Sequence, residues 1–271
     1  MRIAVDHRTH YRFSEPQARI VEMLRLTPGD TRDQTVVAWD IEVNVDARLR
    51  RARDGFGNII TMLYADGPIE ALDIAVTGEV LTADSSGVVH GANEPLPPLL
   101  FRRSGRRTRL TAELADFADT AAAGASDPID RLHRINLALF EHFGTIAPNR
   151  DQGFTAGAAF RLEAVAPRDL AHMFIATAHG MGLPARYVSG YRRVADQPSC
   201  AAHAWAEAYV EKLGWVSFDP SAGMSADEHY VRVAVGLDAQ GAAPIIGQRI
   251  GPGSEALDVD VHVDQLGGEA E

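Results

Sequence analysis

The chain has little of several features that would assign it to a class at once. One of its 271 residues is a cysteine and 7% are aromatic. No apolar run reaches the roughly 18 residues of a membrane-spanning helix. Because Cys200 has no second cysteine to pair with, a disulfide-stapled fold is excluded and a reducing compartment is favoured. The first residues soon become polar, with no apolar signal segment and no small-residue cleavage site, so we expect a cytoplasmic protein without a membrane partner.

An excess of positive charge is also missing. The formal net charge is -11 and the isoelectric point is near 5.4, which argues against a nucleic-acid or anionic-membrane surface. A cluster of arginines between residues 102 and 109 is a local exception, which we interpret as a solvated linker rather than an anion site. With 46% hydrophobic residues, the chain can bury a substantial core, and we expect two domains.

The first hundred residues have the pattern of an antiparallel β domain. Apolar residues alternate with polar ones at 3–5, 37–45 and 72–76, which indicates strands with one buried face. Turn signals separate these segments at 28–29, 54–58 and 66–68. We therefore predict a sandwich-like β domain at 1–100, with its boundary inside the Gly-, Pro- and Arg-rich segment 84–107.

The remainder predicts an α+β core at 101–265, followed by a frayed acidic tail at 266–271. Asp127 and Pro128 are a helix start, and apolar residues then recur every three or four positions until Gly144. A second helix is expected from Arg168 to Gly180. Strands of an antiparallel sheet behind this helix are expected at 187–191, 203–210, 214–218, 230–235 and 257–263.

Two of these strands predict a contact between an imidazole and a carboxylate. His203 begins the segment His-Ala-Trp-Ala-Glu, and Asp219 follows sixteen residues later in Ser-Phe-Asp-Pro. A histidine oriented by a carboxylate is the base of a nucleophilic triad, which also requires a thiol or hydroxyl against the imidazole. The segment 165–172, where this nucleophile is expected, contains no Cys, Ser or Thr.

Several motifs closely resemble the bacterial transglutaminase-like cysteine peptidase superfamily. The core motifs are Leu183-Pro-Ala-Arg-Tyr-Val-Ser-Gly-Tyr191, the segment at His203 and the segment at Asp219. The N-terminal segments at 7–11, 24–28 and 54–58, with Gln34 and Trp39, are similar to the β-rich region that accompanies this core, and 230–236 with 243–244 to its returning C-terminal segment. The resemblance covers nearly the whole chain. It implies a papain-like α+β core with a Cys at a helix start, a His on a facing strand and an Asp on the next strand, which form a thioester with a Gln side chain or peptide carbonyl.

At one position the chain departs from this pattern. The helix start of the family usually reads Gly-Val-Cys-x-Asp-Phe-Ala-His, and the corresponding residues are Val165-Ala-Pro-Arg-Asp-Leu-Ala-His172, so Pro167 occupies the nucleophile position. Proline has no nucleophilic atom and no N–H for an oxyanion hole. His203 and Asp219 then remain as the base and its orienting partner. Cys200, three residues before His203, is a weak alternative nucleophile, because on a regular strand the two side chains project to opposite faces.

Other polar residues near this segment have structural and functional interpretations. Arg168 and Asp169 are expected at the cleft mouth, and Trp205 and Tyr191 around the cleft. Arg168 could clamp a carboxylate there, but a solvent-facing role is favoured for it. Asp169, His172 and His179 share a helix face, but a packing or capping role is favoured over a metal site. We expect no metal and no other cofactor.

Three hypotheses for function remain open. The favoured one is a non-catalytic module whose cleft binds a peptide or a partner protein. The second is an amide hydrolase or amidotransferase that uses Cys200 or a water activated by His203. The third is an architectural role in which the N-terminal β domain mediates assembly into a homo-oligomer.

Overall fold

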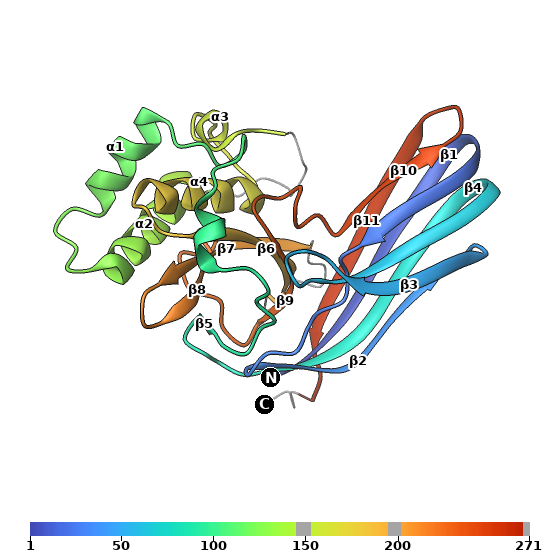
Figure 1. Cartoon of the computed structure of the whole chain (residues 1–271), viewed down its shortest axis with the longest axis horizontal. Coiled ribbons are helices and arrows are strands. Elements are labelled where there is room, and N and C mark those ends of the chain that lie inside the picture. Colours follow the sequence, from blue (N-terminus) through green and yellow to red (C-terminus); the bar gives the residue numbers. More distant parts are fainter. Residues whose placement is uncertain (145–152, 195–201, 268–271) are drawn as a thin grey trace.

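A computed structural model describes residues 1–144, 153–194 and 202–267. It is an α+β structure with two sheets (Figure 1). One sheet forms a β module, and the other carries the helices of the core. No helix among the described residues is both long and apolar enough to cross a bilayer.

Two long strands run through the whole β module. β1 (Arg2–Leu24) and β4 (Ile59–Thr82) pair antiparallel along their length, and the register shifts between Arg12 and Arg19. On one side of this shift β11 (Glu255–Gln265) and β2 (Gln34–Val43) flank the pair, and on the other side β10 (Ile245–Ile250) and β3 (Ala47–Arg53) flank it. Side chains from both halves share one hydrophobic cluster. The structure thus has an antiparallel β module, as the alternation of apolar residues predicts.

The C-terminal strands correct one prediction. The segment 257–263 was expected in the core sheet, but it lies in β11, which pairs with β1 from Ile3 to Phe13. Its alternation predicts a strand without naming a partner, because pairing is set by burial in the tertiary structure. The β module is thus completed by both ends of the described chain, at 2–82 and 245–265.

The core sheet has five strands in the order β5 (Val88–Val89), β8 (Gly214–Phe218), β7 (His203–Val210), β6 (Ala185–Arg192) and β9 (Tyr230–Gly236). A 3-10 turn, η1 (Pro98–Arg102), leads from the β module into this core. The helices are α1 (Ala112–Ala121), α2 (Pro128–Phe143), α3 (Ala156–Ala159) and α4 (Pro167–Gly180). The predicted start of α2 is confirmed, because the Asp127 side chain accepts a hydrogen bond from the Asp130 N–H.

Helix α4 packs on one face of the core sheet. Small residues of β7, namely Ala204, Ala206 and Ala208, share a fully buried cluster with the helix. Because side chains alternate along a strand, His203, Trp205 and Glu207 project from the opposite face. That face carries polar side chains and a hydrophobic cluster of Val188, Trp205, Tyr230 and Val235, against which Phe56 of the β module packs.

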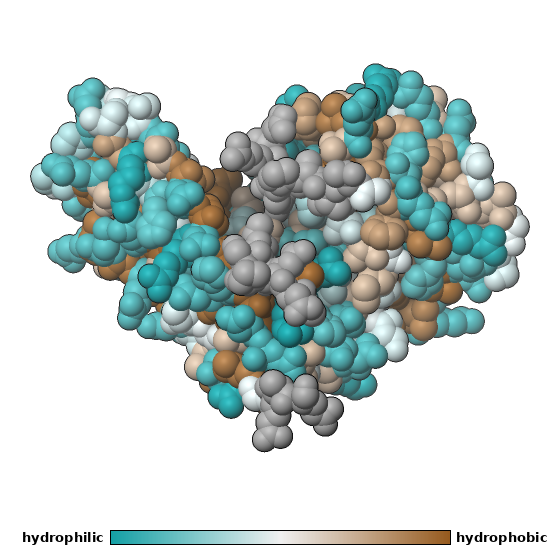
Figure 2. Space-filling view, turned by 180° about the vertical axis from the view of Figure 1, so that it is seen from behind, coloured by the Kyte–Doolittle hydropathy of each residue, from teal (hydrophilic) through white to brown (hydrophobic). Residues whose placement is uncertain are grey.

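The two modules meet through apolar side chains and a buried polar contact. Ile3, Val5 and Val80 of the β module share a cluster with Val231 and Tyr191 of the core. Seen from behind, the surface is hollowed between the far end of the β module and the core (Figure 2). The modules are thus joined at one end of the β module, and they separate towards its other end.

Candidate functional site

The structure brings His203 and Asp219 into direct contact, as their spacing predicts. His203 is the first residue of β7, and Asp219 directly follows β8, which pairs with β7 through Ala206 and Phe218. Nε2 of His203 lies 2.6 Å from Oδ2 of Asp219. The imidazole is nearly buried, with 11% of the side chain exposed, and the carboxylate is fully buried.

Hydrogen bonds hold the Asp219 carboxylate from several sides. The Tyr230 hydroxyl donates to Oδ2 at 2.8 Å, and the Ser221 hydroxyl and N–H donate to Oδ1 at 2.6 and 2.9 Å. Burial alone would raise the pKa of Asp219, but the charge of His203 and the hydrogen bonds from His203 and Ser221 lower this pKa to about 2. Asp219 is therefore ionised at neutral pH.

An ionised Asp219 determines which imidazole nitrogen carries the proton. Because the carboxylate only accepts hydrogen bonds, Nε2 of His203 donates to it, and Nδ1 is the ring nitrogen that this contact does not use. Within the described parts of the chain no hydrogen bond to Nδ1 is present. The guanidinium of Arg192 lies close to the pair, with Nη1 3.8 Å from Oδ2 of Asp219.

Among the described residues, the hydroxyl groups near the pair bond to the carboxylate and not to Nδ1 of the imidazole. Ser221 and Tyr230 both bond to Asp219, so each stabilises the orienting group rather than occupying a nucleophile position. Sequence reasoning missed Ser221, Tyr230 and Arg192. Ser221 follows the quoted Asp219-Pro motif and Tyr230 opens the quoted C-terminal segment, but neither position by itself indicates contact with Asp219.

Pro167 is the first residue of α4 and is buried. The helix runs antiparallel to β6, since His179 near its end contacts the carbonyl of Ala185 and the ring of His172 packs on Tyr187. Its N-terminal end therefore points towards the end of the sheet where β7 begins. Arg168 follows Pro167 and is partly exposed. Cys200 lies outside the described residues.

The polar side chains of α4 have structural roles. Oδ2 of Asp169 accepts a hydrogen bond from the N–H of Ala166 before the helix, although at 3.4 Å this bond is long. Nε2 of His172 accepts from the N–H of Ala239, and Nε2 of His179 bonds to the carbonyl of Phe101. These partners agree with the capping and packing interpretation of this helix face.

The other residues expected around the cleft are buried. Trp205 stacks on the imidazole of His203, with ring centroids 6.1 Å apart, and packs edge-on against Tyr230. Tyr191 is 2% exposed and faces the β module, where its hydroxyl contacts His7. Trp205 thus lies directly beside the pair, whereas Tyr191 belongs to the interface between modules.

A buried ionic cluster lies further along the face of the core sheet that carries His203. Glu207 accepts hydrogen bonds from Arg186 at 2.6 Å and Arg232 at 2.7 Å, and Arg186 also binds Glu94 of the linker. Burial opposes ionisation of Glu207, but the charges of Arg232 and Arg186 lower its pKa to about 2. The guanidinium of Arg186 lies 3.8 Å from the centroid of Trp215. This cluster ties the linker to the core sheet.

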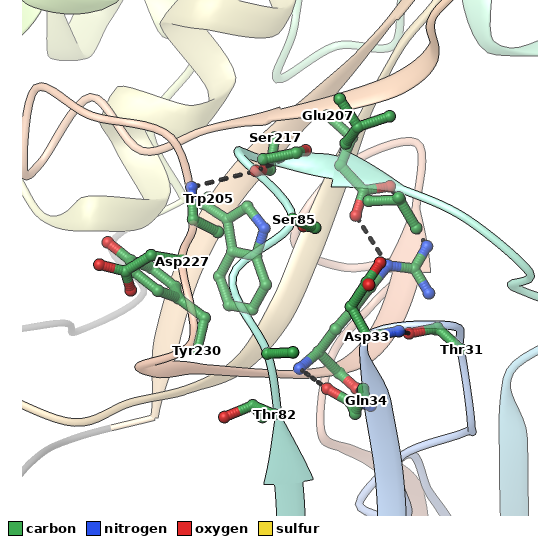
Figure 3. Close-up of a pocket in the computed structure, with 16 residues that line it drawn as sticks. Thr31, Asp33, Gln34, Thr82, Ser85, Trp205, Glu207, Ser217, Asp227 and Tyr230 are labelled. Carbon is green, nitrogen blue, oxygen red and sulfur yellow. Dashed lines mark hydrogen bonds and ion pairs between the residues drawn. The ribbon is translucent and has the colours of Figure 1, made fainter. Parts of the chain in front are cut away.

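A cavity of about 60 Å³ lies between the β module and the face of the core sheet that carries Trp205 and Glu207 (Figure 3). Trp205, Glu207 and Tyr230 line it from the core, and Gln34 and Thr82 line it from the β module. It has room for a few water molecules and none for a peptide. Any peptide ligand must therefore approach His203 from outside this cavity.

Three residues of types that can bind metal ions lie together in the loop before β9. Asp227, Glu228 and His229 present ligand atoms within 4.8 Å of one another. Asp227 already accepts from the N–H of His229 and contacts its ring at 3.0 Å. The loop therefore has a sufficient explanation in its own hydrogen bonds.

Comparisons with known proteins agree with this architecture. Residues 3–81 match the bacterial transglutaminase-like N-terminal region, and residues 115–220 match the transglutaminase-like superfamily. Both parts of the chain are thus similar to bacterial transglutaminase-like proteins.

Relatives and a solved structure extend the match over the whole chain. The uncharacterized protein ML0607 of Mycobacterium leprae is 28% identical, over 98% of this chain and 99% of its own. The uncharacterized protein Rv2569c of Mycobacterium tuberculosis is 26% identical, over 97% and 92%. A crystal structure from Cytophaga hutchinsonii, named "Putative Cysteine Protease", superposes with a TM-score of 0.78 at 18% identity, over 100% of this chain and 92% of that one. At this identity the likeness shows a shared fold.

Proposed function

We propose that this protein is a transglutaminase-like module without thioester chemistry, whose cleft at His203 and Asp219 binds a peptide or protein segment non-covalently. The proposal rests on Pro167, the first residue of α4, which the resemblance of segment 165–172 to the family motif assigns to the position of the cysteine. A nucleophile must give up a proton to the imidazole before it attacks, and a proline side chain has none to give.

The arrangement around Asp219 supports a retained binding site. A buried carboxylate that is bonded by His203, Tyr230 and Ser221 keeps the imidazole in one orientation and one tautomer. Nδ1 is then available to a hydrogen-bond donor of a ligand, such as a peptide N–H. The indole of Trp205 lies beside the ring of His203 and fixes it further.

Restoring the missing thiol tests the proposal. In a Cys200→Ser background, Pro167→Cys should give a thiol that iodoacetamide alkylates rapidly, and adding His203→Ala should slow this alkylation by about tenfold or more. The Cys200→Ser protein with Pro167 retained is the matched control and should show no alkylation in the cleft.

Activity assays on the wild-type protein separate the proposal from the enzymatic alternatives. With a short glutaminyl peptide and methylamine, we expect no ammonia release above that of His203→Ala. Ammonia release that Cys200→Ser abolishes would show that Cys200 is the nucleophile. Hydrolysis that persists in Cys200→Ser but is lost in His203→Ala would show a water-based mechanism. Either result contradicts the proposal.

Binding is the positive counterpart of these assays. Calorimetric titration of the wild-type protein with the same glutaminyl peptide should give a signal that His203→Ala weakens. We also propose a cytoplasmic location, because a lone thiol suits a reducing compartment. Fractionation of cells that express the full chain would test it.

A further inference from the structure

Strand β9 is an edge strand of the core sheet, and the β module covers its outer side. β9 pairs with β6 on one side only. An uncovered edge would leave backbone groups without partners. Side chains of the β module supply hydrogen-bond partners for this edge at defined positions.

Gln34 and Thr82 form hydrogen bonds with the backbone on both sides of Tyr230. These two residues are cross-strand neighbours in β2 and β4. The Gln34 amide donates to the carbonyl of Arg232 at 2.9 Å and accepts from the N–H of Arg232 at 2.8 Å. The Thr82 hydroxyl donates to the carbonyl of Glu228. We call this pair of residues the Gln34–Thr82 clamp. It holds the loop two residues before Tyr230 and strand β9 two residues after it.

The clamp is buried and fully bonded. Gln34 is 6% and Thr82 7% exposed. The second N–H of the Gln34 amide donates to the carbonyl of Gly29 at 2.8 Å. A buried amide whose donors and acceptor are all used has one favourable orientation, because any rotation leaves a polar group unpaired.

Tyr230 transmits this position to the His203–Asp219 pair. Its hydroxyl donates to Oδ2 of Asp219, the same oxygen that contacts Nε2 of His203. Its ring packs against Trp205, with centroids 5.4 Å apart, and against His203 at 5.9 Å. A displacement of Tyr230 therefore changes both the hydrogen bonding of the carboxylate and the packing of the imidazole. Figure 3 shows Gln34, Thr82 and Tyr230 together in the lining of the cavity.

We propose that Gln34 and Thr82 are positioning residues of the His203–Asp219 pair, which act through β9 and Tyr230. The docked β module is then a structural condition of an intact site. The proposal goes beyond the proposed function, since it holds whether the cleft catalyses a reaction or only binds a ligand.

Asn58 provides a matched control within the same interface. Its side-chain amide donates to the carbonyl of Val235 and accepts from the N–H of Val235, both at 2.8 Å. The chemistry equals that of Gln34 at Arg232, but the contact lies five residues beyond Tyr230. Loss of Asn58 should loosen the modules without moving Tyr230.

The experiment follows the proton on Nε2 of His203 by NMR in the full chain. Held against the ionised Asp219, this proton should give a low-field resonance, assigned by its absence in His203→Ala. Gln34→Ala and the near-isosteric Thr82→Val should shift this resonance or lose it to exchange, as should Tyr230→Phe. Asn58→Ala should lower the melting temperature as much as Gln34→Ala and leave the resonance in place.

Two results would overturn the proposal. One is an unchanged resonance in Thr82→Val or Tyr230→Phe, the milder variants that decide the test if Gln34→Ala does not fold. The other is an equal change in Asn58→Ala, which would reduce the clamp to general support of the interface.

Discussion

Nδ1 of His7 lies 2.8 Å from the hydroxyl of Tyr191 and joins the β module to the core sheet. The other ring nitrogen, Nε2, contacts the Thr9 hydroxyl at 3.2 Å, and His7 is 2% exposed. Neither hydrogen-bond partner carries a charge, and the carboxylate of Asp6 only partly offsets the cost of burying an imidazolium.

The first prediction is that acid weakens this contact between modules. Burial lowers the pKa of His7 to about 4, from an ordinary value of 6.5. Between these two pH values the unfolded chain binds a proton that the folded chain does not, so the free energy of unfolding falls as pH falls from 6.5 to 4, by up to ~3 kcal/mol. Urea unfolding across this range should show a steeper pH dependence for the wild type than for His7→Gln.

Tyr191→Phe separates protonation from hydrogen bonding in this test. It removes the hydroxyl and leaves the imidazole buried, so it should lower stability at pH 7 and retain the pH dependence below it. If His7→Gln retains the wild-type slope, His7 is not the titrating group.

The second prediction is a pH dependence of stability with the opposite sign, caused by a carboxyl group buried in the β module. Burial and, after it, the charge of Glu255 raise the pKa of Glu22 to about 7, from an ordinary value of 4.5. Above pH 4.5 the unfolded chain has released this proton while the folded chain still holds it. The free energy of unfolding therefore falls as pH rises from 4.5 to 7, by up to ~3 kcal/mol. Glu22→Gln should raise the melting temperature at pH 8 and leave it nearly unchanged at pH 4.5, and an unchanged melting temperature at pH 8 would contradict the prediction.

The third prediction is a large cost for breaking the buried ionic cluster. Glu207→Gln leaves Arg186 and Arg232 without their shared charge partner, and removal of one member of a buried ion pair costs about 3 kcal/mol or more. Glu94→Gln is the control. Because Glu94 is 29% exposed and Arg186 keeps Glu207, its loss should cost about 1 kcal/mol. If chemical denaturation shows that both variants lose the same unfolding free energy, the burial of Glu207 does not determine its contribution to stability.

The fourth prediction tests the packing behind His203. A Cβ atom on Gly190 would lie 2.1 Å from the backbone carbonyl of Val231 and 2.8 Å from the Trp205 ring. Gly190→Ala should therefore cost about 1–3 kcal/mol and disturb the indole, which the fluorescence spectrum would report. Gly55→Ala is the control, because nothing lies within 4 Å of its added Cβ. An unaltered melting temperature for Gly190→Ala would mean that β6 and β9 separate more easily than their pairing indicates.

Local pattern was sufficient to predict much of the fold and the central pair of the site. Alternation located the central strands, and the Asp127-Pro128 start located α2, because capping and strand burial depend on neighbours in the sequence. It failed at β3, whose sequence Ala-Arg-Leu-Arg-Arg-Ala-Arg has too few apolar residues to signal a strand. It also failed to name the partner of β11, because strand pairing is not encoded within the strand itself.

By itself the sequence predicted that the imidazole of His203 and the carboxylate of Asp219 meet, because their spacing places them on adjacent antiparallel strands. That Pro167 occupies the position of the family's cysteine is a hypothesis that rests on the resemblance of segment 165–172 to the family motif. Only the tertiary structure decided what surrounds the pair: Tyr230 and Ser221 at the carboxylate, and Gln34 and Thr82 at the backbone on either side of Tyr230. These contacts join residues far apart in the chain, and buried polar groups find such partners only when the two sheets pack together.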